Sequence, residues 1–300
     1  MKSMVLCTSS LDCGNKWRSL QDAGHDVHVV LYDDRPHNRH MELVEEVRHI
    51  APDFAVFIGA CEQFYDRPVP NTDILCRIRA LTPFIHMCDD AADLPWWPQL
   101  QMYHDQSCFT VQVNIDGSYE TPIAGFDEGL TLLTPTDTRA FSPRPWQERE
   151  IQFCFVGSGG GGRTEIMSQL RGRGLQYYHV DPSRSYESMA ALLCNSRFVF
   201  NHPLTGTGAR SHVKGRVIEA GFAGAALIEF GSSPITSWFQ SNEYFTATTA
   251  DDVDKIVREA SGEDVAARLH ERVVREHHPR IFWDRVLKKA GVKTQNGVVL

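Results

Sequence analysis

Residues 214–230 read KGRVIEAGFAGAALIEF, which predicts a short helix, a glycine stop and a buried strand. Arg216 and Glu219 are three positions apart, so they share one face of the helix. Gly224 suits the end of the helix, and residues 225–230 form a mostly apolar run of strand length. A cation and a carboxylate on a helix of small residues indicate a site where a ligand approaches the backbone. A surface ion pair would leave the same pattern.

The composition describes a globular chain with a slightly acidic balance. The 300 residues suggest two domains of ordinary size, although one large α/β domain would also fit. Hydrophobic residues make up 42% and charged residues 23%, which is enough apolar material for a core. The formal net charge of -8 argues against broad binding of a phosphate backbone, so a nucleic-acid partner is not expected.

The eight cysteines are scattered, and none forms a Cys-x-x-Cys pair. This spacing argues against a zinc ribbon or a thioredoxin-like motif and favours a reduced, cytoplasmic protein. The chain enters a strand almost at once, so we expect no signal peptide. No apolar run approaches the roughly 20 residues that a membrane-spanning helix needs.

The first half alternates predicted strands with predicted helices. The strands are expected at residues 4–8, 27–32, 54–58 and 83–87, and the helices at residues 16–23, 41–50 and 74–81. This order predicts a parallel sheet with right-handed crossovers. After Leu94 we expect a loop packed on aromatic residues, and residues 136–147, rich in Pro, Thr and Arg, are the predicted linker.

Polar side chains lie at and beyond the end of the predicted strand at residues 83–87. In open parallel sheets, ligands bind beyond the carboxyl ends of the strands. His86, Asp89, Asp90 and Asp93 are therefore candidates for acid–base work or for holding sugar hydroxyls. Helix capping and solvated loop carboxylates are the alternative interpretation.

A glycine-rich turn opens the second half. Residues 157–162 join a predicted strand to a predicted helix, and Arg163 adds a positive charge where backbone N–H groups would face an anion. The turn also satisfies G-x-G-x-x-G, and the next strand ends at Asp181, 19 positions after Gly162. That arrangement fits the fingerprint of a nicotinamide cofactor and supports an oxidoreductase as a rival hypothesis.

Two further patterns bear on metals. Thr249 to Asp252 predicts a capping box, and we assign the Asp-Val-Asp run at residues 252–254 to helix capping rather than to a metal–nucleotide site. His277 and His278 are adjacent and so point apart on a helix. We therefore expect no metal site.

The second half resembles the glycosyltransferase group 1 family, in its spore-maturation-protein-like branch, over roughly residues 151–285. The residues that carry the likeness are Phe153 to Gly157 with Arg163, then Tyr186 through Asn201, and above all Gly215-Arg216-Val217-Ile218-Glu219-Ala220 with Gly224. A weaker echo lies in the first half at Gly24-His25-Asp26-Val27.

The resemblance implies an α/β protein of GT-B type, with two Rossmann-like domains whose parallel sheets face a central cleft. Residues 1–145 would form the acceptor-side domain and residues 146–280 the nucleotide-sugar donor domain. Residues 281–300 would hold a C-terminal helix that crosses back to the first domain.

The resemblance also implies roles for the donor side. Glu219 would hold the ribose hydroxyls, because a carboxylate can accept from two vicinal hydroxyls. Lys214, Arg216 and Arg163 would neutralise the diphosphate and stabilise the leaving group. The remaining implied donor-binding residues are Gly157, Ser158, Gly159 and Asn201.

One position departs from the family pattern. Many group 1 enzymes carry a glutamate eight positions before the ribose-binding one, and here that position is Ser211. The glutamate's contact with the donor sugar, and a retaining stereochemistry inferred from it, are therefore not implied. For the acceptor side, Asp90, Asp89 and His86 are the predicted catalytic residues.

The preferred hypothesis is a metal-independent transfer of a sugar from a nucleotide diphosphate sugar to an acceptor that no motif identifies. We expect no cofactor besides the nucleotide sugar as co-substrate. The alternatives are an NAD(P)-dependent oxidoreductase that uses Gly157 to Gly162 with Asp181, and a non-catalytic nucleotide-sugar-binding protein on the same scaffold.

Overall fold

The computed structural model describes residues 1–8, 11–59, 68–89, 97–118, 130–157, 162–175, 178–179, 185–205, 207–208 and 210–293. The chain divides into two compact units. The first unit combines Met1–Leu132 with Pro279–Leu300, and the second is Leu133–His278.

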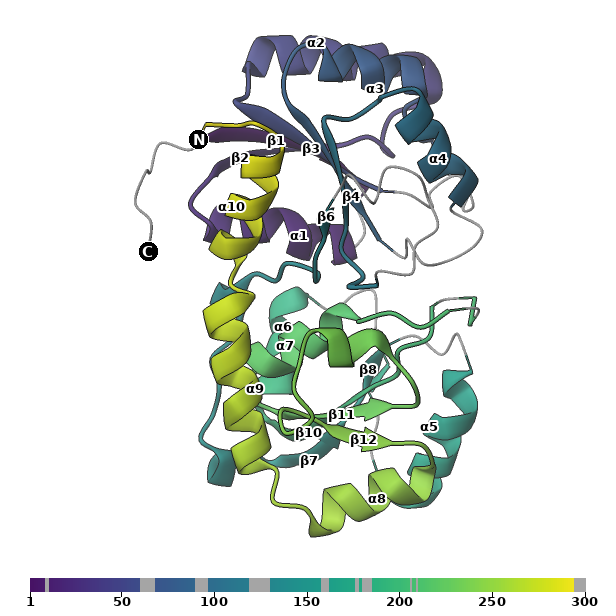
Figure 1. Ribbon diagram of the computed structural model, residues 1–300, viewed down its shortest axis with the longest axis vertical. Coiled ribbons are helices and arrows are strands. Elements are labelled where there is room, and N and C mark those ends of the chain that lie inside the picture. Colours follow the sequence, from purple (N-terminus) through teal and green to yellow (C-terminus); the bar gives the residue numbers. More distant parts are fainter. Residues whose placement is uncertain are drawn as a thin grey trace. The chain divides into compact units, whose positions relative to one another are not determined.

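The first unit is built on a parallel sheet with the strand order β2-β1-β3-β4-β5-β6 (Figure 1). The strands are β1 (Lys2–Cys7), β2 (Asp26–Leu31), β3 (Phe54–Ile58), β4 (Phe84–Cys88), β5 (Val111–Asn114) and β6 (Leu130–Thr131). The expected parallel sheet is thus confirmed. Central strands such as β3 and β4 are buried along their whole length; β3 is an unbroken apolar run, and β4 is apolar except for His86.

Helices cover both faces of this sheet. They are α1 (Leu11–Asp22), α2 (Met41–Ile50), α3 (Thr72–Arg79), α4 (Trp97–Asp105) and α10 (Pro279–Lys289). One apolar cluster joins the sheet to α1 and α10, and a second joins it to α2, α3 and α4.

The last helix of the chain completes the core of the first unit. Trp283 on α10 is fully buried, and its indole Nε1 donates a hydrogen bond of 3.0 Å to the Ser19 hydroxyl on α1. Figure 1 shows α10 beside α1. Residues at the two ends of the sequence therefore share one apolar cluster.

The prediction of a loop after Leu94 was wrong for residues 97–105, which form α4. Pro98 suggested irregular structure, but it is the second residue of the helix. A proline is tolerated in the first turn because the N–H group that it lacks would have no partner within the helix.

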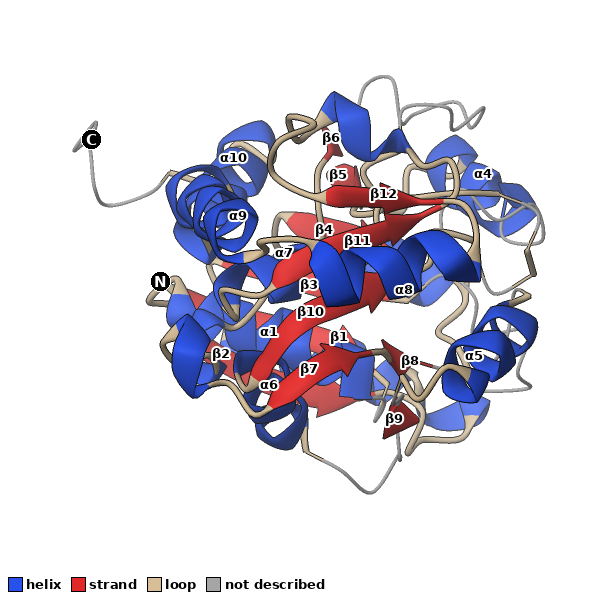
Figure 2. Ribbon diagram, turned by 90° about the horizontal axis from the view of Figure 1, so that it is seen from below, coloured by secondary structure: helices blue, strands red, loops and turns tan. Residues whose placement is uncertain are grey.

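The second unit has its own parallel sheet in the order β12-β11-β10-β7, beside a two-stranded pair of β8 and β9 (Figure 2). The strands are β7 (Ile151–Cys154), β8 (Val156–Gly157), β9 (Tyr178–His179), β10 (Ser196–Asn201), β11 (Ala226–Phe230) and β12 (Phe245–Ala247). The helices are α5 (Arg163–Gly172), α6 (Tyr186–Cys194), α7 (Gly215–Phe222), α8 (Ala250–Glu259) and α9 (Glu263–Glu276). Short 3₁₀ turns lie at His37–Arg39, Thr138–Ala140, Trp146–Glu148 and Pro234–Ser237.

The segment predicted as a linker belongs to the second unit, which begins at Leu133 rather than at residue 146. Leu133 and Phe141 are buried in the apolar cluster around α6 and α7. Arg149 is 5% exposed and donates to the carbonyls of Ser196, at 2.7 Å, and Ala223, at 3.0 Å. These contacts tie a proline-rich stretch to the sheet, which its composition did not reveal.

Two smaller features bear on the expectations from sequence. Thr249 and Asp252 form the predicted capping box at the start of α8. Among the residues that the structure describes, no helix is both long enough and apolar enough to cross a membrane.

Helix α7 packs closely against α9, and a glycine permits this approach. A Cβ atom placed on Gly221 would lie 2.6 Å and 2.7 Å from the two Cγ atoms of Val273. Such distances are well inside van der Waals contact, so either the valine or the helix would have to move.

We expect Gly221→Ala to destabilise the protein by roughly 1–3 kcal/mol through overpacking, despite the better helix propensity of alanine. Urea unfolding followed by circular dichroism measures the change. Gly172→Ala is the matched control, because nothing lies within 4 Å of its Cβ position. Adding Val273→Ala should relieve the clash, and equal stability of Gly221→Ala and Gly172→Ala would contradict the close-packing argument.

Candidate active site

Helix α7 lies where the connection from β10 to β11 turns back along the sheet. Because β10 and β11 are parallel, the helix between them starts near the carboxyl ends of the strands. Lys214 is the extended residue before the helix, and Arg216 and Glu219 follow within its first turns. The sequence therefore brings these three side chains to the ligand-binding edge of the second sheet.

Glu219 is a nearly buried carboxylate with two defined partners. Its Oε2 lies 2.7 Å from Nη1 of Arg216, and its Oε1 accepts a hydrogen bond of 3.2 Å from the Tyr186 hydroxyl. The side chains of Glu219 and Arg216 are only 9% and 13% exposed. The expected Arg216–Glu219 pair is present, but it is a buried pair rather than a surface one.

The Tyr186 hydroxyl is held in its neutral form. Burial raises the pKa of Tyr186 well above its ordinary value, and the negative charge of Glu219 raises it further. A neutral phenol keeps its proton and can donate it to the carboxylate. Tyr186 therefore adds a donor to Glu219 without adding charge.

Besides burial, the positive charges of Arg163 and Lys214 both lower the pKa of the His202 imidazole. Burial, as the largest cause, and the charges of Arg163 and Lys214 together lower the pKa of His202 to about 4. Arg163 is 8% exposed and donates from Nη2 to the Leu204 carbonyl at 2.7 Å. Two cations, one on α5 and one directly before α7, thus create a positive region around His202, which directly follows β10.

Asn201, the last residue of β10, contacts a second buried glutamate. Its Nδ2 donates to Oε2 of Glu229, on β11, at 2.7 Å. Glu229 is 1% exposed. Burial outweighs the opposing hydrogen bonds from Asn201 and Ser233 and raises the pKa of Glu229 to about 7.

The glycine turn is only partly described. Gly157 ends β8, and a Cβ there would lie 2.8 Å from the ring of Phe155. Gly162 adopts a φ of 79° directly before α5, a conformation that favours glycine. Ser158, Gly159 and the Asp181 of the oxidoreductase hypothesis lie outside the described residues.

Asp89 of the first unit, which directly follows β4, is paired with a lysine. Nζ of Lys16, on α1, lies 2.5 Å from its Oδ2, and the Asp89 side chain is 31% exposed while that of Lys16 is 4% exposed. A carboxylate with a cation at this distance is favoured in its ionised, acceptor form. Asp90 and Asp93 lie outside the described residues.

His86 does not lie with Asp89 at the end of the strand. It is in the middle of β4 with no exposed surface, its Nε2 lies 2.6 Å from the Gly59 carbonyl, and its Nδ1 lies 3.2 Å from the amide of Gln112. Burial lowers its pKa to about 4, which keeps the ring neutral. These contacts hold His86 in the interior of the sheet, so the partly exposed Asp89 is the better placed of the two for acceptor-side chemistry.

The described residues contain no group of three or more His, Cys, Asp or Glu side chains placed to hold a metal ion. The carboxylate of Asp252, the first acid of the Asp-Val-Asp run, accepts hydrogen bonds from Thr248 and Thr249. Those hydrogen bonds lower its pKa to about 2. They are the contacts expected of a capping residue.

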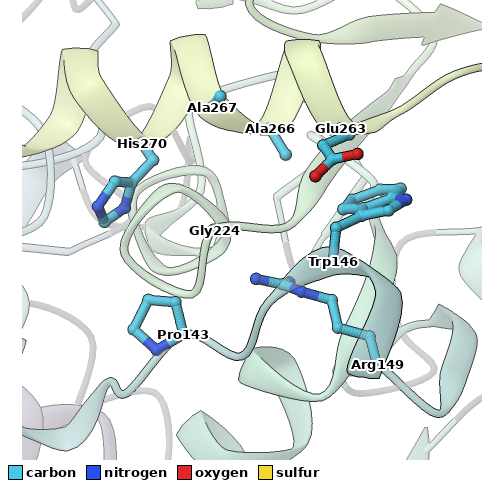
Figure 3. A pocket seen from close by; sticks show the side chains of 8 residues that line it. All are labelled: Pro143, Trp146, Arg149, Gly224, Glu263, Ala266, Ala267 and His270. Atoms are coloured by element: carbon cyan, nitrogen blue, oxygen red, sulfur yellow. The ribbon is translucent and has the colours of Figure 1, made fainter.

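A cavity of about 170 Å³ lies elsewhere in the second unit (Figure 3). Its lining includes Trp146, Arg149, Gly224 and Glu263. Arg149 precedes β7 and Gly224 precedes β11, so this cavity is at the amino ends of the strands. None of the predicted donor-binding residues that the structure describes lines it.

Sequence reasoning missed three residues of the site: Tyr186, His202 and Glu229. The glutamate within the apolar run of β11 could have been identified from the sequence. Acidic residues are rarely fully buried unless they are paired, so one in a buried strand indicates a specific role. Tyr186 carries no such signal, since an aromatic residue at the start of an apolar helix is ordinary core material.

The Glu229 carboxyl should make stability depend on pH. Its pKa is about 7 in the folded protein against an ordinary value of 4.5, so the folded state holds the proton more tightly. Stability linked to this proton is fully present below about pH 4.5 and is lost as pH rises toward 7.

We expect the wild type to lose on the order of 3 kcal/mol relative to Glu229→Gln between pH 4.5 and 7.5, because glutamine stays neutral. Urea unfolding at several pH values measures the difference. The control is Glu259→Gln, which changes an exposed carboxylate and should follow the wild type. Parallel pH profiles for the wild type and Glu229→Gln would contradict the assignment.

Comparison with solved structures shows the fold. The chain matches HepE from Anabaena in complex with UDP and glucose, with a TM-score of 0.61, 10% identity, and coverage of 97% of this chain and 99% of that one. It matches sucrose-phosphate synthase from Thermosynechococcus elongatus with a TM-score of 0.59 and 10% identity, over 96% and 99% of the two chains. An alpha-glucosyltransferase in complex with UDP-glucose and DNA containing an abasic site gives a TM-score of 0.57 at 12% identity, over 96% and 99%.

The expected GT-B fold is thereby confirmed. No curated protein matches the sequence significantly. The model of the family described as glycosyl transferase-like matches residues 139–288, which contain α7 and the buried Arg216–Glu219 pair. The narrower likeness to the spore-maturation-protein-like branch stays a prediction. With half of its length matched, the chain belongs to the glycosyl transferase-like family.

Proposed function

We propose that this glycosyltransferase moves a sugar from a nucleotide diphosphate sugar to an acceptor, without a metal ion or another cofactor. The observation that carries the proposal is the nearly buried carboxylate of Glu219 at the ligand-binding edge of the second sheet. A carboxylate offers about four acceptor sites on two oxygens, which suits the paired hydroxyls of a ribose.

The positive region beside Glu219 supplies the second half of donor binding. Arg163 and Lys214, whose charges converge on His202, would neutralise the diphosphate. In the transfer, the bond between the sugar and the diphosphate breaks and negative charge grows on the departing phosphate. Fixed cations lower the barrier to that step because they are already oriented.

UDP is the first nucleotide to test. The solved structures of HepE and of the alpha-glucosyltransferase are described as complexes with UDP or UDP-glucose. Those proteins share the fold of this chain at 9–12% identity, so their nucleotide serves as a starting hypothesis here.

Asp89 is the proposed catalytic group of the acceptor side, with Asp90 as its predicted neighbour. An ionised carboxylate can take the proton of an acceptor hydroxyl as that oxygen attacks the sugar. Nζ of Lys16 lies 2.5 Å from Oδ2 of Asp89, and a neighbouring cation favours the ionised form of a carboxylate. The predicted role of Asp90 rests on its position next to Asp89 in the sequence.

A non-catalytic nucleotide-sugar-binding protein is the second candidate, and Ser211 favours it. This serine stands where many group 1 enzymes carry a glutamate, and it pairs in an isolated β-bridge with Leu204, whose carbonyl accepts from Arg163.

A cytoplasmic location is our further expectation, since Cys7, Cys88 and Cys154 are buried free thiols.

We expect Glu219→Gln to weaken UDP binding roughly ten- to a hundredfold, because hydrogen bonds to a charged acceptor are lost or weakened. Isothermal titration calorimetry measures the affinity, with 2′,3′-dideoxy-UDP as the ligand that lacks both ribose hydroxyls. The dideoxy ligand should bind wild type and variant alike. Glu259→Gln is the matched control on an exposed carboxylate. An equal loss of affinity for UDP and for the dideoxy ligand would show that Glu219 does not recognise the ribose hydroxyls. Thermal stabilisation of the protein by NAD(H) and not by nucleotide sugars would overturn the proposed donor.

We expect Asp89→Asn to lower turnover on the order of a hundredfold or more while leaving UDP affinity unchanged, because it removes a general base without touching the donor site. Hydrolysis of a UDP-sugar in the absence of acceptor, and transfer to a panel of acceptors, are the measurements. Asp73→Asn, at an exposed carboxylate on α3, should behave as wild type. Binding of nucleotide sugars without hydrolysis or transfer by the wild type would favour the non-catalytic alternative.

A further inference from the structure

The orientation of Glu219 is set by two donors, one for each oxygen. Arg216 contacts Oε2 and Tyr186 contacts Oε1. A glutamate side chain has three rotatable bonds, so a single partner would leave its carboxylate plane free to turn. With a donor on each oxygen, the plane is defined.

The two donors differ in how firmly they are placed. Arg216 lies on the same helix as Glu219, and its Nη1 also approaches Sδ of Met189 at 3.3 Å. Tyr186 comes from α6, which packs against α7. The Arg216–Glu219 ion pair lies within α7 and meets α6 through the thioether of Met189, a weak acceptor, whereas the Tyr186 hydroxyl bonds the carboxylate to α6 directly.

Tyr186 itself is tightly held. It is the first residue of α6, directly after Ser185, whose hydroxyl accepts from the Ser188 N–H at 3.2 Å and fixes the start of the helix. The tyrosine is 6% exposed, and its ring meets Phe141 edge-on at 6.1 Å. The Tyr186 side chain therefore has little conformational freedom, and its hydroxyl is held next to Glu219.

The arrangement leaves acceptor capacity for a ligand. Each carboxylate oxygen can accept about two hydrogen bonds, so one site on each oxygen is used by the protein. The site that remains on each oxygen matches the two neighbouring hydroxyls of a ribose. Because burial keeps the tyrosine neutral, its donation persists across the ordinary pH range.

We propose that Tyr186 is a positioning residue for donor recognition, which holds the Glu219 carboxylate so that it accepts both ribose hydroxyls of the nucleotide. The inference rests on the proposed function of Glu219 and adds a residue from a different helix to it. Tyr186 acts through Glu219 and does not touch the reacting atoms.

The test compares Tyr186→Phe with wild type for UDP and for 2′,3′-dideoxy-UDP. We expect UDP affinity to fall on the order of tenfold and dideoxy-UDP affinity to change less than twofold, because only the ribose hydroxyls depend on the carboxylate's orientation. Tyr244→Phe is the matched control, since Tyr244 is a tyrosine buried in the same apolar cluster. In a Glu219→Gln background, Tyr186→Phe should have no further effect on UDP affinity.

The outcomes separate the inference from the proposed function. A similar loss of affinity for both ligands would mean that Tyr186 only supports the fold, and it would overturn the inference. The inference would also be overturned if Glu219→Gln changes the discrimination between the two ligands and Tyr186→Phe does not. In that case the proposed role of Glu219 stands. If Glu219→Gln also leaves the discrimination unchanged, both fail. Circular dichroism melting of Tyr186→Phe and Tyr244→Phe checks that both variants fold.

Discussion

A parallel sheet gathers the carboxyl ends of its strands at one edge, and this constraint places the candidate site of the second unit. Asn201 ends β10 and Glu229 lies near the end of β11, while the connecting chain brings Lys214 and α7 back to the same edge. Arg163 reaches that edge because α5 also starts there, after the glycine turn. Side chains that are far apart in the sequence thus share one region without any local motif joining them. The close packing of α7 on α9 at Gly221 holds the helix in this place.

Two buried glutamates at this edge have different electrostatic environments. Glu219 has a cation, Arg216, and a neutral donor, Tyr186, so its charge is compensated. Glu229 has the neutral amide of Asn201 as its hydrogen-bond partner, and burial raises its pKa to about 7. A buried carboxylate without a cation is costly in its charged form, whereas a paired one can stay charged. The compensated carboxylate is the one suited to hold ribose hydroxyls, because an ionised group accepts hydrogen bonds more strongly.

The first unit separates two residues that follow one another closely in the sequence. Asp89 lies beyond the end of β4, is partly exposed and is paired with Lys16, which makes it available for chemistry. His86, three positions earlier, is buried in the sheet and hydrogen-bonded to Gly59 and Gln112. A strand side chain is committed to one face of the sheet, whereas a residue past the strand end can turn toward solvent or a ligand. Proximity in sequence to a strand end therefore does not determine whether a side chain is buried in the sheet or exposed.

The sequence by itself determined the parallel α/β architecture, the capping box at Thr249 and the shared helical face of Arg216 and Glu219, because these follow from local periodicity and spacing. It misplaced the stretch at 136–147, since proline-rich composition masked the burial of Phe141, and it missed α4, whose aromatic residues suggested a packed loop. Only the tertiary structure decided that Glu219 is buried, that Tyr186 is its partner and that Glu229 lies beside Asn201. Tyr186 and Glu219 are 33 positions apart, and their contact depends on how α6 packs against α7. Side-chain packing between helices sets that distance, and no local pattern encodes it.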